Sequence, residues 1–218
     1  MPQGYVKVTD LPQVVPVFPL DGALLLPRGQ LPLNIFEPRY LNMVDDAMAG
    51  ERVIGMIQTV GGQRARPDLA NIGCIGRVTA YSETSDGRYL VTLTGVARFR
   101  VAGELPVQTP YRQVQVDYEA FHEDLKPSPE DFAFDREHFL DALKAYLTRR
   151  ALDVDWATAE AAPEEALVNS LSMALPFDPA EKQALLEADS LVDRRKALTA
   201  LLQIDAADPS DGAPPAVQ

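Results

Sequence analysis

The first 120 residues alternate short apolar runs with glycine, proline or charged residues. Three of these runs have the length and composition of β-strands, at residues 14–18, 31–36 and 53–57. Prolines fall within or beside the first two runs, and proline in a sheet is confined to edge strands, strand starts and bulges. The pattern therefore predicts short, interrupted strands in place of a flat central sheet.

One amphipathic helix interrupts this strand-like half. Pro38 suits the first helical position, and Gly50 follows the helix as a stop signal. Between them, apolar side chains recur on one face at positions 40, 41, 44 and 48. We therefore expect a helix that begins at Pro38 and ends just before Gly50.

A period of two returns from residue 72 onward. Apolar positions 78, 80, 91 and 93 alternate with polar neighbours, and a turn signal at 85–87 separates two strand-like runs. Gly95 can break or bulge the returning strand, and a last alternation occupies residues 114–118. Many short antiparallel strands with one helix predict a small, partly closed β-barrel.

The character of the chain changes at residues 122–132, which are charged and contain two prolines. Beyond this segment apolar residues follow helical spacing. Helix starts are indicated at 128–131, after Pro163, at 178–181 and at 190–193. Pro176 ends the second of these helices. The second half is therefore predicted to be a compact helical bundle.

We accordingly predict an α+β fold with three parts along the chain. Residues 1–121 form a β-rich subdomain, and residues 122–204 form the helical bundle. Residues 205–218 contain three prolines and few large apolar side chains, so we expect a disordered tail there.

The formal net charge of −12 is unevenly distributed. Residues 1–120 carry 11 basic and 12 acidic side chains, whereas residues 121–218 carry 9 and 20. An acidic field favours solubility and disfavours nucleic acids and anionic membranes, which both require a positive footprint. The N-terminus does not resemble a signal peptide, and no apolar run approaches the roughly 20 residues of a spanning helix. These features predict a cytoplasmic protein without membrane contact.

The motifs of common catalytic and cofactor sites are missing from the sequence. None of the five lysines follows a glycine, which excludes a Walker A loop, and neither GxGxxG nor GxSxG occurs. His122 and His138 stand sixteen residues apart without an HExxH pattern. The single cysteine, Cys74, lies near Ile72 and Ile75 in a strand-like segment and is expected to be a small buried hydrophobe. We therefore predict no catalytic, cofactor-binding or metal-ligating residue, and no enzyme activity.

A series of short motifs occurs in a fixed order along the chain. They are Phe18-Pro19-Leu20, Pro27-Arg28-Gly29, Leu31-Pro32-Leu33, Glu37-Pro38-Arg39-Tyr40, Ile75-Gly76-Arg77-Val78, Gly95-Val96-Ala97-Arg98-Phe99, and Leu175-Pro176 with Glu181-Lys182-Gln183. This series resembles the Lon protease N-terminal, or substrate-binding, domain family over residues 12–203.

The resemblance implies a β-rich, PUA-like pseudo-barrel followed by helices. A full Lon protease continues into an AAA+ ATPase and a Ser-Lys peptidase, whereas this sequence ends at residue 218 with neither. The resemblance therefore indicates a stand-alone bacterial member, a non-catalytic polypeptide-binding or adaptor module without ATPase or protease activity of its own. Its expected partners are polypeptide clients or one partner protein, such as a separate protease.

Three residues near the start of the predicted helix are candidates for contact with a polypeptide: Phe36, Arg39 and Tyr40. Aromatic and arginine side chains dominate the energetics of protein interfaces. The alternative for Phe36 and Tyr40 is core packing at the strand–helix junction. The alternative for Arg39 is an ion pair that ties the helix to an acidic neighbour.

RNA binding is the alternative function, because PUA-like folds elsewhere bind RNA. It requires a local basic patch, and the near-neutral charge of the first half argues against one. Five arginines of that half are available for such a patch: Arg64, Arg66, Arg77, Arg98 and Arg100.

Overall fold

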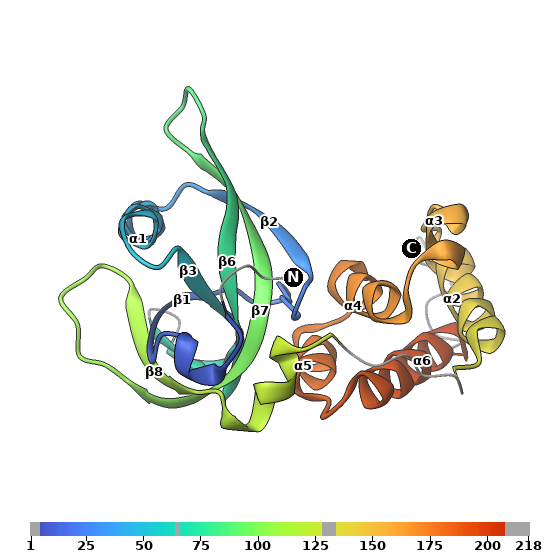
Figure 1. Cartoon of the computed structure of the whole chain (residues 1–218). Coiled ribbons are helices and arrows are strands. Elements are labelled where there is room, and N and C mark those ends of the chain that lie inside the picture. The colour runs from blue at the N-terminus through green and yellow to red at the C-terminus, as the bar shows by residue number, and fades with distance from the viewer. Residues whose placement is uncertain (1–4, 64–65, 128–133, 208–218) are drawn as a thin grey trace. The chain divides into compact units, whose positions relative to one another are not determined.

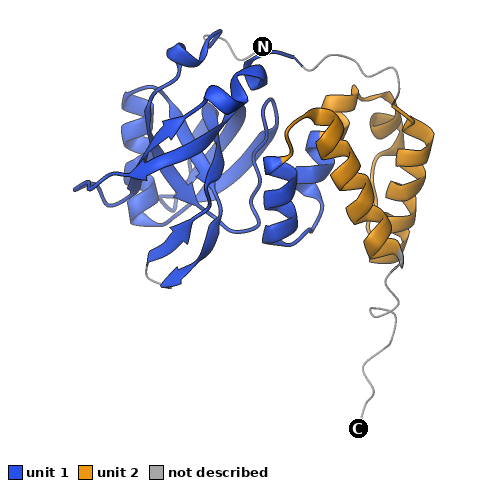
Figure 2. Ribbon diagram, turned by 90° about the horizontal axis from the view of Figure 1, so that it is seen from below, with its two compact units in different colours: residues 1–128, 169–187 blue, residues 129–168, 188–218 orange. Residues whose placement is uncertain are grey.

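The chain forms two compact units, one β-rich and one helical (Figure 2). A computed structural model describes residues 5–63, 66–127 and 134–207. The first unit comprises residues 1–128 and 169–187, and the second comprises residues 129–168 and 188–218.

A six-stranded mixed sheet forms the first unit (Figure 1). Its strands are β1 (Val14–Pro19), β2 (Gln30–Ile35), β3 (Val53–Ile57), β6 (Ile72–Glu83), β7 (Tyr89–Glu104) and β8 (Arg112–Asp117). They are ordered β2-β7-β6-β3-β1-β8, and β8 also pairs with β7. Because of this second pairing, β1, β3, β6, β7 and β8 close into a ring. The predicted α+β class and partly closed barrel are confirmed.

The strand directions differ from the prediction at one place. β1 and β3 are parallel, whereas the other strand pairs of this sheet are antiparallel. A parallel pair needs a crossover connection, and the long segment between β1 and β3 supplies it with β2 and helix α1 (Pro38–Ala49). Pro38 opens α1 and Gly50 caps it, as predicted.

The hairpin between β6 and β7 confirms the predicted turn at 85–87. The pairing of the two strands shifts at Val96, an extra residue beside Gly95. An added Cβ at Gly95 would lie 2.0 Å from the carbonyl oxygen of Leu26. Glycine at this position therefore lets the segment after β1 cross directly over β7.

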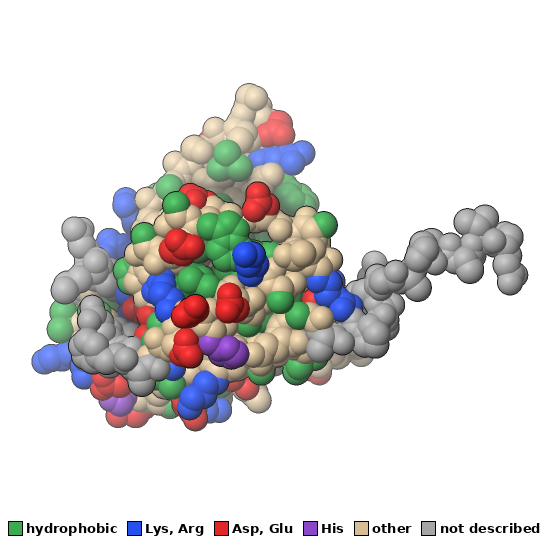
Figure 3. Space-filling view, turned by 90° about the vertical axis from the view of Figure 1, so that its right-hand side faces the viewer, with side chains coloured by type: hydrophobic (Ala, Val, Ile, Leu, Met, Phe, Trp, Pro, Cys, Tyr) green, Lys and Arg blue, Asp and Glu red, His purple; other side chains and the backbone are tan. Residues whose placement is uncertain are grey.

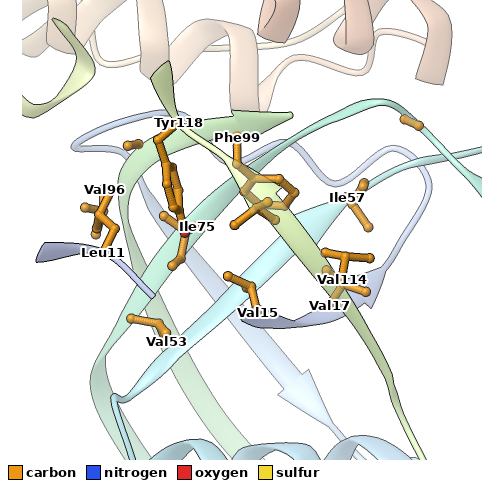
Figure 4. Packing of buried hydrophobic residues seen from close by; sticks show 13 residues of the cluster. Leu11, Val15, Val17, Val53, Ile57, Ile75, Val96, Phe99, Val114 and Tyr118 are labelled. Atoms are coloured by element: carbon orange, nitrogen blue, oxygen red, sulfur yellow. The ribbon is translucent and has the colours of Figure 1, made fainter. Parts of the chain in front are cut away.

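Buried apolar side chains fill the barrel (Figure 4). The labelled members of this cluster are Leu11, Val15, Val17, Val53, Ile57, Ile75, Val96, Phe99, Val114 and Tyr118. Each large apolar side chain buried in this way stabilises the fold by about 1.5–3 kcal/mol before entropy is counted. Cys74 is also fully buried, as expected for a thiol that acts as a small hydrophobe.

Smaller elements complete the first unit. They are the 3₁₀ helices η1 (Val8–Asp10) and η2 (Glu119–Leu125), the hairpin β4 (Thr59–Gln63) and β5 (Arg66–Leu69), the end of α4 (Glu164–Ala174), and α5 (Pro179–Glu187). The two-stranded β4–β5 sheet was not predicted, because two adjacent glycines interrupt any alternation in β4.

Polar side chains attach α5 to the barrel unit. Gln58, which is buried, donates from Nε2 to the carbonyl oxygen of Pro179 and to Oε1 of Gln183, both at 3.0 Å. Lys182 donates from Nζ to the carbonyl oxygens of Gly22, at 2.8 Å, and Met173, at 3.1 Å. Burial lowers the pKa of the Lys182 ammonium.

Residues 169–187 belong to the first unit, so the segment 122–204, expected to form one bundle, is divided between the two units. η2 also belongs to the barrel unit, beyond the expected boundary at residue 121. The start signal of α5 is confirmed. Asp178 and Glu181 cap α5 reciprocally, with both hydrogen bonds at 2.9 Å.

The second unit contains α2 (Arg136–Arg150), α3 (Trp156–Ala161), the start of α4 and α6 (Leu191–Ala207). Asp135 caps α2, so this helix starts later than predicted, and residues 128–133 lie outside the described range. α6 includes residues 205–207, which we had assigned to the tail; the remainder of that tail also lies outside the described range. Figure 3 shows a face of the molecule on which acidic, basic and hydrophobic side chains are interspersed.

Candidate functional site

The three candidate residues lie at the junction of β2 and α1 but differ in exposure. Phe36 is 62% exposed, so it is a surface residue and the core alternative is wrong for it. Tyr40 is 5% exposed and packs in the core, with its ring centroid 4.2 Å from that of Phe18. Burial raises the pKa of the Tyr40 phenol.

Arg39 is half-exposed and has two neighbours on its own helix turn. Its guanidinium pairs with the carboxylate of Glu37 at 2.8 Å, and it lies over the ring of Tyr40, 4.5 Å from the centroid. The acidic neighbour considered from the sequence is therefore Glu37. A cation over an aromatic face contributes about 0.5–1 kcal/mol at an exposed site.

A hollow of about 680 Å³ brings Arg39 and Tyr40 together with residues from distant segments. It lies among the end of β1, the start of α1, the β4–β5 hairpin and the segment that enters β8. Its lining residues are Pro19, Leu20, Asp21, Arg39, Tyr40, Thr59, Arg66, Pro67, Pro110, Tyr111 and Arg112. Phe36 is outside this set. The volume falls within the range of ligand sites in proteins.

Two arginines of the hollow share one carboxylate. Arg112 donates to both oxygens of Glu104, at 2.8 and 2.7 Å, and Arg66 donates to one of them at 2.8 Å. Hydrogen bonding from Arg112 is the main cause that lowers the pKa of Glu104 to about 2. Arg112 also donates to the carbonyl oxygen of Pro67, which fixes the hairpin against β8.

Tyr111 links the hollow to α1, and sequence reasoning missed it. Its hydroxyl donates to Asp46 at 2.6 Å. Burial, together with this bond, raises the pKa of Tyr111 to about 12. Tyr111 precedes a strand and carries no motif of its own, so its role depends on the folded barrel.

Two further hollows adjoin the first. One of about 170 Å³ shares Tyr111 with it, and one of about 440 Å³ shares Thr59. The second of these lies between β4 and α5, where Val60 is 63% exposed. The three hollows therefore form a series along one unit, with the largest of the three in the middle.

The basic patch considered for RNA binding does not include Arg98. Arg98 is 4% exposed and donates to both carboxylate oxygens of Asp124, at 2.8 and 2.9 Å, and to the carbonyl oxygen of Leu186 at 3.1 Å. It ties β7 to η2 and α5. Arg66 is paired with Glu104, and Arg64 lies outside the described range.

Within residues 5–63, 66–127 and 134–207, no group of three His, Cys, Asp or Glu side chains could hold a metal ion. No helix in that part of the chain has the length and apolar character needed to cross a membrane.

With this fold and site, the chain belongs to a known family. Residues 14–203 match the substrate-binding domain of ATP-dependent protease La (LON), so the chain is a member of the Lon substrate-binding domain family. The match includes the whole ring of strands, the lining of the 680 Å³ hollow and most of the helical unit.

Relatives and solved structures agree with this assignment. The chain is 31% identical to Lon protease 2 of Myxococcus xanthus over 53% of its own length and 14% of that protein. It is 25% identical to Lon protease of Flavobacterium johnsoniae over 85% of its length and 23% of that protein. It therefore spans less than a quarter of these relatives.

Two solved structures share the fold. The Lon N-terminal domain protein from Xanthomonas campestris superposes with a TM-score of 0.60 at 26% identity, over 86% of this chain and 97% of that one. The N-terminal domain of the Mycobacterium avium complex Lon protease gives a TM-score of 0.62 at 18% identity, over 88% and 98%.

Proposed function

We propose that this protein is a non-catalytic module that recognises polypeptide segments, and that the hollow beside α1 is where it holds them. Membership in a substrate-binding domain family supports the general role. The observation that carries the location is the hollow itself, where Arg39 and Tyr40 meet the prolines, Leu20 and Tyr111. Phe36, exposed at the same junction, is an additional contact beside it.

The chemistry of this lining suits a polypeptide. Leu20 is 37% exposed and offers an apolar contact, and tyrosine and arginine are the side chains most enriched at binding hot spots. Proline rings present rigid apolar surface at little entropic cost. The ion pairs that fix Arg39 and Arg112 keep the walls in place before a client arrives, which reduces the ordering cost of binding.

The proposal also separates client recognition from ATP hydrolysis and peptide cleavage. The module captures clients in the cytoplasm and passes them to a partner, such as a separate protease, and contributes neither ATP hydrolysis nor peptide cleavage. Incubation of the full chain with β-casein, with and without Mg-ATP, tests this part. We expect the casein band to remain intact on a gel, and time-dependent fragments would contradict the assignment.

Binding of fluorescein-labelled β-casein, a largely unfolded protein, tests recognition and its location. We expect saturable anisotropy with the full chain, and Leu20→Asp should weaken it by about fivefold or more because a charge replaces apolar contact. Leu152→Asp in the second unit is the matched control, since Leu152 is 41% exposed, close to the 37% of Leu20. Equal affinity of both variants would place the site elsewhere; no binding by the unaltered chain would contradict polypeptide recognition.

A further inference from the structure

The lining of the central hollow is rich in cations on a protein that is strongly acidic overall. Three arginines line it, at positions 39, 66 and 112, whereas the net charge of the chain is −12. Asp21 also lines the hollow, and its Oδ1 already accepts hydrogen bonds from the backbone N–H and the hydroxyl of Thr59, at 2.9 and 2.7 Å. Glu37 and Glu104 pair with these arginines and offset two of the three positive charges, so the remaining cation lies at the cluster of Arg66 and Arg112, and an anionic group would meet it there.

Among the three arginines, Arg66 is the one presented to a ligand. Arg112 is 20% exposed and is held by both oxygens of Glu104, and Arg39 pairs with Glu37. Arg66 is 70% exposed and donates to Glu104 through Nη2. Because Glu104 is shared between two guanidinium groups, the cluster of Glu104, Arg66 and Arg112 carries a net positive charge.

Apolar surface lies beside this cation within the same hollow. Leu20 and the rings of Pro19, Pro67 and Pro110 line it together with Tyr111. A bound group that pairs with Arg66 therefore has an apolar wall next to it. This combination suits two adjacent side chains of one polypeptide, one acidic and one apolar.

The two neighbouring hollows offer a bound chain a direction in which to continue on either side of the central one. The hollow of about 170 Å³ adjoins the central one at Tyr111, and the hollow of about 440 Å³ adjoins it at Thr59. A segment that follows the series enters and leaves the central hollow. The carboxylate that reaches Arg66 then belongs to an internal side chain and not to the C-terminus of the bound chain.

Resting on the proposed function, we propose that the hollow selects extended polypeptide segments in which an internal Glu or Asp side chain neighbours an apolar residue. Arg66 receives the carboxylate and Leu20 contacts the apolar side chain. This selection refines polypeptide recognition and can fail while recognition itself holds.

Three labelled peptides test the selection on the full chain. The first has Leu-Glu-Leu in the centre of Gly/Ser flanks with both ends blocked, the second has Leu-Gln-Leu in the same context, and the third is the Gln peptide with a free C-terminal carboxylate. At low salt we expect the Glu peptide to bind about three- to fivefold more tightly than either Gln peptide, the range of an exposed ion pair. Raising the salt concentration should shrink this ratio because screening weakens the pair.

Arg66→Gln should bring the Glu-to-Gln affinity ratio close to one, with the thermal unfolding midpoint unchanged because Arg66 is exposed. Lys126→Gln is the matched control: Lys126 is 65% exposed, is paired with Glu123, and lies outside the lining of the hollow. The Glu-to-Gln affinity ratio of this control variant should equal that of the unaltered chain.

The outcomes separate the two proposals. Equal binding of all three peptides to the unaltered chain overturns acidic selection and leaves polypeptide recognition standing. Preference for the free carboxylate over the internal Glu overturns the internal-side-chain assignment. A Glu preference that persists in Arg66→Gln overturns the role of Arg66. If no peptide binds and β-casein also fails to bind, both proposals are wrong.

Discussion

The two units use charged side chains in different ways. In the barrel unit, charges are buried and join segments far apart in the chain: Arg98 on β7 meets Asp124 in η2 and the carbonyl of Leu186 in α5. In the helical unit, Asp135 and Asp155 cap the starts of α2 and α3, and ion pairs such as Arg195 with Glu164 join its helices. The barrel unit therefore has a buried ion pair at the junction of three elements, whereas the helical unit combines local caps with ion pairs between its helices.

This difference teaches where each unit is vulnerable. A buried ion pair is costly to break because the remaining charge stays desolvated, whereas a peripheral pair contributes little. The chain also provides separate reporters. Its single tryptophan, Trp156, lies in the helical unit, and six of its seven tyrosines lie in the barrel unit. Tyrosine near-ultraviolet circular dichroism therefore follows mainly the barrel, and tryptophan fluorescence follows the helices.

The largest expected effect is at Arg98. Arg98→Ala leaves Asp124 buried without its partner, which should lower the free energy of unfolding of the barrel unit by about 3–5 kcal/mol. In urea, the tyrosine signal should change at a much lower concentration, while the Trp156 transition shifts less. If both signals shift together, the two units unfold as one, and the conclusion that they differ in vulnerability is wrong.

A second variant separates charge from packing at the same site. Arg98→Met combined with Asp124→Leu removes both charges, so most of the lost stability should return. Some loss should remain, because Asp124 also accepts a hydrogen bond from the backbone N–H of Arg98 at 2.9 Å. If the double variant is no more stable than Arg98→Ala, then altered side-chain packing, and not the unpaired Asp124 carboxylate, causes the loss of stability.

A smaller effect is expected in the helical unit, at Arg195. Its guanidinium pairs with Glu164 at 2.6 Å, both side chains are largely buried, and it lies over the ring of Phe134. Arg195→Gln should lower stability by about 1–2 kcal/mol on the Trp156 transition and leave the tyrosine transition in place. Lys196→Gln is the control, because its pair with Asp193 is exposed and 3.8 Å long, so it should cost under about 0.5 kcal/mol.

Local signals explain most of what the sequence predicted correctly. Pro38 and Gly50 bound α1, and the Asp178–Glu181 box starts α5, because each depends on residues within one or two turns. Gly95 also marked the bulge of β7 correctly, because its small size is required by a backbone that crosses it. These features need no knowledge of the partner segments.

The unpredicted features depend on contacts between distant segments. The residues of α5 carry no local pattern that indicates hydrogen bonds with Gln58 and Gly22. The sequence therefore could not assign α5 to the barrel unit. The site shows the same limit. Arg39 and Tyr40, which are candidates from the sequence, line the hollow from α1, whereas Tyr111 reaches it only because β8 closes the ring.

The smallest effect concerns the pH dependence of the cluster at the hollow. Glu104 has a folded-state pKa of about 2 against an ordinary value of 4.5, with Arg112 as the main cause. Because the folded pKa is the lower one, the stabilisation is fully present above about pH 4.5 and is lost as the pH falls towards 2. Solvent screens this partly exposed group, so we expect a contribution of about 1 kcal/mol. Unfolding midpoints measured from pH 6 to pH 2 should therefore fall more steeply for the unaltered chain than for Glu104→Gln. Parallel curves would mean that the pair between Arg112 and Glu104 orders the wall of the hollow without stabilising the barrel.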